Sequence, residues 1–155
     1  MSIARDIAPE IVEEVIKLRE RTLLEGAMAA SALVAMADRR LKVEESLALG
    51  SVLENVEALR IHDPHLAIDL YGGFVDGMRT DFAQGRDQAL AAVARCADDL
   101  EAAELLVKVG IAVAKADNEF QPEEVEVVGA ICERLGIVGL DPNALVGKLK
   151  PNRAH

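Results

Sequence analysis

The residues of this sequence that could do chemistry are carboxylates, and they gather at two related places in the chain. The segment VAMADRRLKVEESLALGSVLE, residues 34–54, aligns with VAKADNEFQPEEVEVVGAICE, residues 113–133. Each copy has an aspartate, a short connector with one large apolar residue, and then a Glu-Glu pair. Self-similarity of this kind indicates a duplicated structural unit, here a helical hairpin with an acidic connection.

The repeated carboxylates form two candidate cation sites. Calcium and magnesium are bound by carboxylate and carbonyl oxygens, and they suit such clusters better than zinc or manganese. The second copy is the better candidate, because the first carries Arg39, Arg40 and Lys42, which could neutralise its aspartate. The candidate metal ligands are Asp38, Glu44 and Glu45 in the first copy and Asp117, Glu119, Glu123 and Glu124 in the second.

The second copy does not match the EF-hand, the best-known calcium loop. With Asp117 at the first position of such a loop, Pro122 stands where glycine is required and Val128 where the bidentate glutamate is required. A cation at this place would therefore be held by a different arrangement of carboxylates.

Helix capping is the alternative explanation of the glutamate pairs. Carboxylates in the first turn of a helix are stabilised by the helix dipole and by capping, at about 0.3–1 kcal/mol each. Asp38 and Asp117 are not explained in this way, because they lie at the C-termini of predicted helices, where the dipole is negative. Amides of the next helix, a lysine or arginine, or a bound cation could compensate them. The sequence leaves both interpretations open.

Other residues that carry chemistry give weaker signals. His62 and His65 could ligate zinc, but no third ligand is placed for it, and the Asp-Pro pair between them is typical of a capped helix start. Cys96 and Cys132 lie in apolar helical runs, where buried and unreactive thiols are usual. No nucleophile motif or nucleotide-binding loop is present, so we expect no enzymatic activity and no catalytic residues.

Hydrophobic periodicity predicts an all-α fold. Apolar residues recur at helical spacing, and no segment is typical of a strand. Helices are predicted at residues 6–24, 25–38, 43–59, 63–82, 84–97, 98–117 and 122–135, with a short one at 143–149. We expect a single domain over residues 1–150, a bundle of about seven helices that contains two related helical hairpins, and a polar tail at 151–155.

The sequence also predicts finer features of this bundle. The run 25–38 is rich in alanine and methionine and nearly free of charge, so we expect it to be buried on most sides. Gly73 and Gly77 lie one turn apart and would permit close contact between helices. Asp98 with Glu101 has the form of a capping box. The connector carboxylates are expected to stay near solvent.

Composition and charge exclude some functions. The chain has 27 acidic and 17 basic residues among 155, a formal net charge of −10, which would repel the phosphates of nucleic acids. No apolar run is long enough to cross a bilayer, so no direct membrane insertion is expected. The first residues lack the apolar region of a signal peptide, and the cysteines lack disulfide-type or metal-finger spacing. We therefore expect a cytoplasmic protein.

The segments MADRRLKVEE and KADNEFQPEE resemble the acidic signatures of the TerB family, the tellurite-resistance-associated helical proteins. The family pattern is roughly A-x-A-D-G-x-hydrophobic-x-x-E-E, and the resemblance extends over about residues 23–137. Arg39 stands where the family usually has glycine, Arg40 stands where an acidic residue is common, and Asn118 replaces the glycine of the second copy.

The resemblance implies a compact fold of about seven helices and an acidic cluster that binds divalent cations. The family's acidic positions fall on the seven carboxylates named above. It implies no known enzyme activity, a link to resistance against tellurite and other stresses, and action at the cytoplasmic face of the inner membrane with membrane-embedded protein partners. The sequence leaves open the oligomeric state, and it leaves open a metal-independent interaction scaffold in which the glutamates only cap helices.

Overall fold

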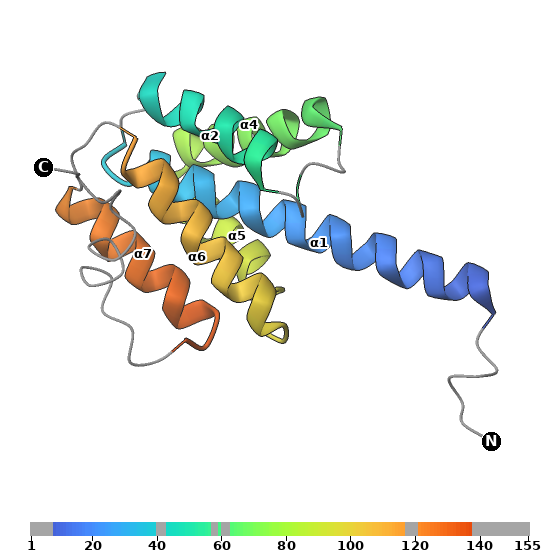
Figure 1. Ribbon diagram of the computed structural model, residues 1–155. Coiled ribbons are helices and arrows are strands. Elements are labelled where there is room, and N and C mark those ends of the chain that lie inside the picture. Colours follow the sequence, from blue (N-terminus) through green and yellow to red (C-terminus); the bar gives the residue numbers. More distant parts are fainter. Residues whose placement is uncertain (1–7, 40–42, 57–58, 60–62, 117–120, 138–155) are drawn as a thin grey trace, which may run out of the picture.

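The computed structural model describes residues 8–39, 43–56, 59, 63–116 and 121–137, and this part of the chain is all-helical. It contains six helices where we expected about seven, and no strand (Figure 1). The helices are α1 (Pro9–Ala35), α2 (Val43–Asn55), α4 (Pro64–Thr80), α5 (Phe82–Ala94), α6 (Leu100–Ala114) and α7 (Pro122–Arg134). The predicted fold class is confirmed, and the short helix expected at 143–149 lies outside the described residues.

One long helix, α1, replaces the two helices predicted at 6–24 and 25–38. The change of composition near Leu24 marks a change of surroundings and not a break, because the helix is exposed before this residue and buried after it. Gly26 does not end the helix either. A Cβ added there would lie 2.8 Å from the Sγ of Cys96 and 2.9 Å from Leu106, so the glycine admits neighbouring helices.

The buried half of α1 forms the centre of the core, as the alanine-rich run predicted. Leu24, Met28 and Leu33 are at most 2% exposed, and Figure 1 shows this half of α1 passing through the middle of the bundle. Helices α4, α5 and α6 pack around it. Leu106 and Ile111 of α6 add large side chains that are fully buried.

The α4–α5 pair depends on a contact between backbones. A Cβ added at Gly85 would lie 2.5 Å from the carbonyl carbon of Gly77 and from the amide nitrogen of Met78. Gly77 therefore serves close packing as predicted, while a Cβ at Gly73 would meet nothing within 4 Å. Gly85, which packs against Gly77, was not predicted, because a single glycine in a helical run carries no packing signal by itself.

Aspartates begin three of the helices. Asp63 caps α4 by accepting from the His65 amide at 2.9 Å, as predicted, and Asp81 caps α5 by accepting from the Gln84 amide at 3.1 Å. The capping box predicted for Asp98 is wrong. The neighbouring Asp99 caps α6 and accepts from the amides of Glu101 and Ala102 at 3.1 and 3.3 Å.

Both thiols are buried, as predicted. Cys96 is 4% and Cys132 is 3% exposed. The Sγ of Cys96 donates to the carbonyl oxygen of Thr22 at 3.6 Å. Burial, assisted by the charge of Asp99, raises the pKa of the Cys96 thiol to about 11, and burial also raises the pKa of Cys132. A thiol with a raised pKa is a poor nucleophile at neutral pH.

We expect Gly85→Ala to destabilise the protein by about 1–3 kcal/mol, because its methyl group would overlap the α4 backbone, which cannot move aside easily. Gly73→Ala is the matched control, since it also replaces a helical glycine but enters open space. It should be neutral or stabilising by up to about 1 kcal/mol. Urea unfolding followed by circular dichroism measures both; equal stabilities would contradict the backbone contact.

The raised pKa of Cys96 also predicts a pH dependence of stability. An unfolded thiol ionises near its ordinary pKa of 9.0, whereas the folded thiol keeps its proton up to about 11. The contribution of Cys96 is therefore complete below pH 9 and is lost as the pH rises toward 11. Urea unfolding across this range should show a steeper loss of stability for the wild type than for Cys96→Ala, and identical slopes would argue against the shift.

Candidate acidic site

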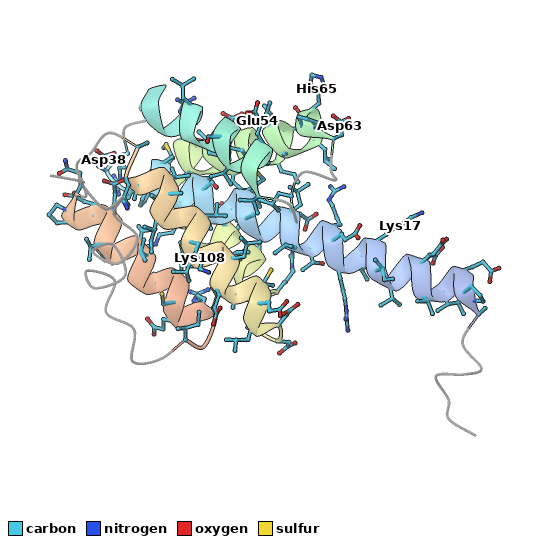
Figure 2. The ribbon with its side chains drawn as sticks, in the orientation of Figure 1. Lys17, Asp38, Glu54, Asp63, His65 and Lys108 are labelled. Carbon is cyan, nitrogen blue, oxygen red and sulfur yellow. The ribbon has the colours of Figure 1, made fainter. Side chains whose placement is uncertain are left out.

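The two repeated hairpins, α1–α2 and α6–α7, place their connections at one end of the bundle. Helices α1 and α6 run toward this end together, since Gly26 packs beside Leu106 and Gly110 lies close to Val34. Helices α2 and α7 begin there (Figure 1). We call this region, with residues 36–39, 121–126 and the first turn of α2, the acidic end. Figure 2 shows Asp38 at this end and Lys17 far from it on α1.

The first connector leaves α1 in a tight turn. Asp38, which is half-buried, follows the last helical residue closely, and the amide of Arg39 donates to the carbonyl of Met36 at 2.9 Å. Arg39 has a φ of 63°, in the left-handed region that glycine adopts most easily. This backbone conformation explains the glycine of the family pattern at this position.

The side chain of Arg39 also contributes to packing. Its guanidinium carbon lies 4.2 Å from the centroid of the Phe82 ring, at the start of α5. A cation over an aromatic face contributes about 0.5–1 kcal/mol at an exposed site. Arg39 therefore joins the first connector to α5 and brings a positive charge to the acidic end.

The second connector enters α7 through Gln121 and Pro122. The Oε1 atom of Glu124 accepts from the backbone N–H of Gln121 at 3.0 Å and so caps the helix. Glu123 is exposed, as expected, but Glu124 is only 3% exposed, so the expectation that the carboxylates stay near solvent is wrong for this residue.

The burial of Glu124 follows from its place on α7. It lies three, four and seven residues before Val127, Val128 and Ile131, which are all buried, so the four side chains share one face of the helix. Folding back to cap the Gln121 amide also draws the carboxylate inward. The sequence contains this signal, since Glu124 stands at helical spacing from three apolar residues, but the repeated Glu-Glu pattern does not distinguish it from Glu123.

The structure describes only part of the predicted site. Glu44 and Glu45 lie in the first turn of α2, although their side chains are outside the description, and Asp117 and Glu119 lie outside the described residues. Among the side chains that are described, no three His, Cys, Asp or Glu residues come close enough together to hold a metal ion. The described acidic residues of the predicted set are Asp38, Glu123 and Glu124.

A charge pair that the sequence did not reveal joins the acidic end to α5. The Nη1 atom of Arg86 in α5 lies 4.0 Å from the Oε1 atom of Glu126 in α7. Exposed ion pairs of this length contribute little to stability, about 0–1 kcal/mol. Together with Arg39, however, Arg86 makes the charge of this surface mixed, so its acidic character depends on the connector carboxylates.

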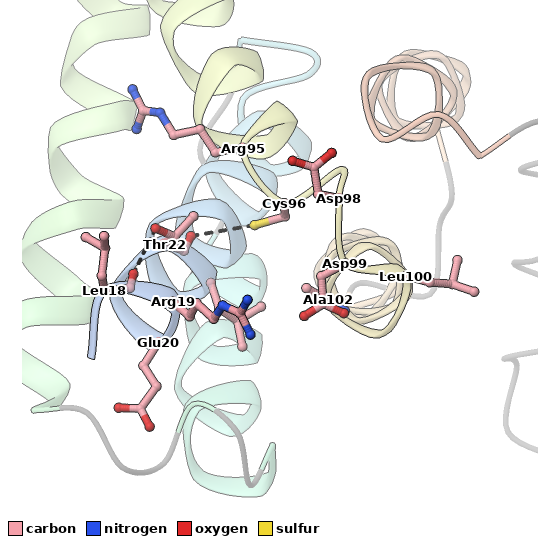
Figure 3. A pocket seen from close by; sticks show the side chains of 11 residues that line it. Leu18, Arg19, Glu20, Thr22, Arg95, Cys96, Asp98, Asp99, Leu100 and Ala102 are labelled. Carbon is pink, nitrogen blue, oxygen red and sulfur yellow. Dashed lines mark hydrogen bonds between the residues drawn. The ribbon is translucent and has the colours of Figure 1, made fainter. Parts of the chain in front are cut away.

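A cavity of about 630 Å³ lies at the other end of α6. It is bordered by α1 and by the α5–α6 connection, with Cys96 and Asp99 among its lining residues (Figure 3). The thiol of Cys96 donates a hydrogen bond to the carbonyl of Thr22, and its raised pKa makes it unsuitable as a nucleophile.

None of the described helices is long and apolar enough to cross a membrane.

These features define a class of protein, an all-helical domain built on two related hairpins with acidic connections. The sequence profile of the tellurite resistance protein TerB matches residues 24–145. The chain therefore belongs to the TerB family. It is also similar to the tellurium resistance protein TerB of an Alcaligenes species, with 24% identity over 102 residues, which cover 66% of this chain and 84% of that protein. No solved structure matches the chain significantly.

Replacing Glu124 should cost far more stability than replacing its neighbour. Glu124→Ala removes the cap, leaves the Gln121 amide without its acceptor and opens a small cavity, so we expect a loss of about 1–3 kcal/mol. Glu123→Ala, the matched control, removes an exposed carboxylate and should cost less than about 1 kcal/mol. Urea denaturation compares the two, and a loss that is equal or larger for Glu123→Ala would refute the assignment.

Proposed function

We propose that this TerB-family protein, a tellurite-resistance-associated module, binds a divalent cation with its connector carboxylates and docks partner proteins at the acidic end. The observation that carries the proposal is the duplicated hairpin, which brings the helix ends that flank both acidic motifs to one end of the bundle (Figure 1). The printed names of the family profile and of the Alcaligenes relative, both concerned with resistance to tellurium compounds, support the biological setting.

Calcium or magnesium suits this site best, because its candidate ligands are carboxylate oxygens. Glu123 is exposed, so its carboxylate is open to an ion, and the proposed ligands Asp117 and Glu119 precede it by six and four residues in the sequence. Glu124 contributes differently, since its Oε1 atom already holds the Gln121 amide. In this proposal Glu124 fixes the first turn of α7 and so positions Glu123. Asp38, Glu44 and Glu45 supply the weaker, first site.

Docking follows from charge. A net charge of −10 favours basic protein surfaces over nucleic acids, whose phosphates it repels. A bound cation would lower the negative charge of the acidic end, so ion binding and partner binding would be coupled. We place this function in the cytoplasm, at the inner membrane when the partner is embedded there, and we propose that it involves no catalysis.

A metal-independent scaffold is the second candidate function, and one observation favours it specifically. The Gln121 amide donates to Glu124 as a helix cap, and this supports a purely structural role for the Glu-Glu pair, because such a bond does not require an ion. If the remaining carboxylates act in the same way, the acidic end is a fixed docking surface. Capture of a partner that is indifferent to chelator would then be expected.

Isothermal titration separates the two functions. Calcium, magnesium, zinc and manganese are titrated into chelator-stripped wild type and into the Asp117→Asn, Glu123→Gln double variant. The matched control is Asp69→Asn with Glu104→Gln, which makes the same charge change at two exposed positions away from the acidic end. We expect saturable heat with calcium or magnesium for the wild type and the control, and none for the double variant.

The outcomes lead to different conclusions. Equal heats for all three proteins would contradict the ligand assignment, because the lost carboxylates would then not matter. No heat with any protein would contradict cation binding and leave the scaffold function. Circular dichroism of each variant verifies that the helices are intact before the titration.

A further inference from the structure

The first part of α1 projects from the bundle as an unsupported arm. Residues 9–19 and Arg21 are exposed, whereas Leu24 is fully buried. Figure 1 shows this half of α1 extending well beyond the other helices. The TerB profile begins at residue 24, so the arm lies outside the part of the chain that matches the family. We call residues 9–21 the α1 arm.

The α1 arm carries apolar side chains that nothing in the described structure covers. Their spacing of three and four residues gives one apolar stripe along the helix. A lone apolar residue on a surface is ordinary, but a continuous stripe on a projecting helix marks a contact surface. The stripe consists of Ile11 (55% exposed), Val12 (43%), Val15 (47%), Ile16 (48%) and Leu18 (68%).

The charges of the α1 arm identify what covers the stripe. Its first half is acidic and its second half is basic. Two arms packed in parallel would place like charges side by side, whereas two antiparallel arms place each acidic half along a basic half. The first half carries Glu10, Glu13 and Glu14. The second half carries Lys17, Arg19 and Arg21 against Glu20, so its net charge is positive, although Arg21 also pairs with Glu25 of its own helix at 3.0 Å.

We propose that the protein forms a homodimer in which the α1 arms of two copies pack antiparallel around Val15. The stripe of one copy covers the stripe of the other, and Glu14 and Lys17, which border the same shallow groove as Val15, face the opposite charges of the second copy. This inference does not depend on the proposed function, because the acidic end takes no part in it.

The base of the arm fits the tip of a second arm. An arm of this length is about 20 Å long, so an antiparallel partner centred on Val15 ends near Thr22. There the partner meets the cavity of about 630 Å³ between α1 and the α5–α6 connection (Figure 3). Leu23 and Leu100 line this cavity, and Leu100 is 66% exposed. With Val15 opposite Val15, Ile11 and Val12 of the second copy would lie opposite Arg19 and Leu18, which line the same cavity.

A membrane surface is a poorer occupant of the same stripe. Helices that lie on membranes are rich in lysine and arginine on their polar face, because the lipid headgroups are anionic. The α1 arm instead has carboxylates at Glu10, Glu13, Glu14 and Glu20, which at least balance its three basic residues. Its charge changes from acidic in the first half to basic in the second, which matches a second, antiparallel arm and not a uniformly charged surface.

The test measures the mass of the full chain in solution by light scattering behind gel filtration. The wild type should have twice the 16.6 kDa of one chain. Val15→Glu places a charge at the centre of the pairing and should return the mass to that of one chain, with its circular dichroism unchanged because Val15 is exposed in the single chain. Ile68→Glu, the matched control at an exposed isoleucine of α4, should remain dimeric.

Charge exchange and crosslinking test the arrangement. Glu14→Lys and Lys17→Glu should each weaken the dimer about tenfold or more in Kd, and their mixture should restore it. In an antiparallel pair, Ile11→Cys should form no disulfide with itself but should form one when mixed with Arg19→Cys. The native thiols are buried and do not interfere.

Several results would overturn the proposal. A wild type with the mass of one chain at every concentration would exclude the dimer, and its co-sedimentation with vesicles of anionic lipid would then assign the stripe to a membrane surface. A dimer that survives Val15→Glu or is lost in Ile68→Glu would exclude the α1 arm as the interface. A disulfide formed by Ile11→Cys with itself would exclude the antiparallel arrangement.

Discussion

The burial of the second half of α1 is the constraint on which the rest of the molecule depends. All the other described helices contact α1, and the three that pack most extensively, α4, α5 and α6, surround its alanine-rich part. Small side chains allow close approach here, while Leu24, Met28 and Leu33 fill the remaining space. Burying a leucine or methionine contributes about 1.5–3 kcal/mol. The position of every other element therefore follows from how closely it can approach this segment.

The close packing of α6 against α1 then determines where the acidic motifs lie. Gly26 admits Cys96 and Leu106, and Gly110 admits Val34, so α6 is held alongside α1 with both helices ending at the same side. The connections that follow them must start there. Two acidic motifs that are far apart in the sequence thus come to one end of the bundle because of helix packing, without any direct attraction between carboxylates, which would repel each other.

Periodicity predicted the helices well because it reflects burial, and it failed where burial changes without a change of structure. The boundary predicted near Leu24 was a change from exposed to buried helix. The prediction of Asp98 as the cap of α6 was wrong, because capping depends on the backbone geometry of a single residue. A sequence pattern locates a helix end only to within a position or two. The internal repeat revealed the acidic motifs themselves, but it does not distinguish Glu123 from Glu124. In the structure Glu123 faces solvent and Glu124 faces the core.

This difference between the two glutamates changes how a cation site in the second motif would have to work. Glu124 is a buried residue that caps the Gln121 amide, and it cannot turn toward solvent without losing that bond, so it holds the first turn of α7 in place. The side chain of Glu123 is exposed, while its backbone belongs to the turn that this bond holds in place. A cation in the second motif would therefore bind Glu123 at a helix start that Glu124 already holds in place. Because this start is fixed before the ion binds, its ordering adds no further cost in conformational entropy to binding.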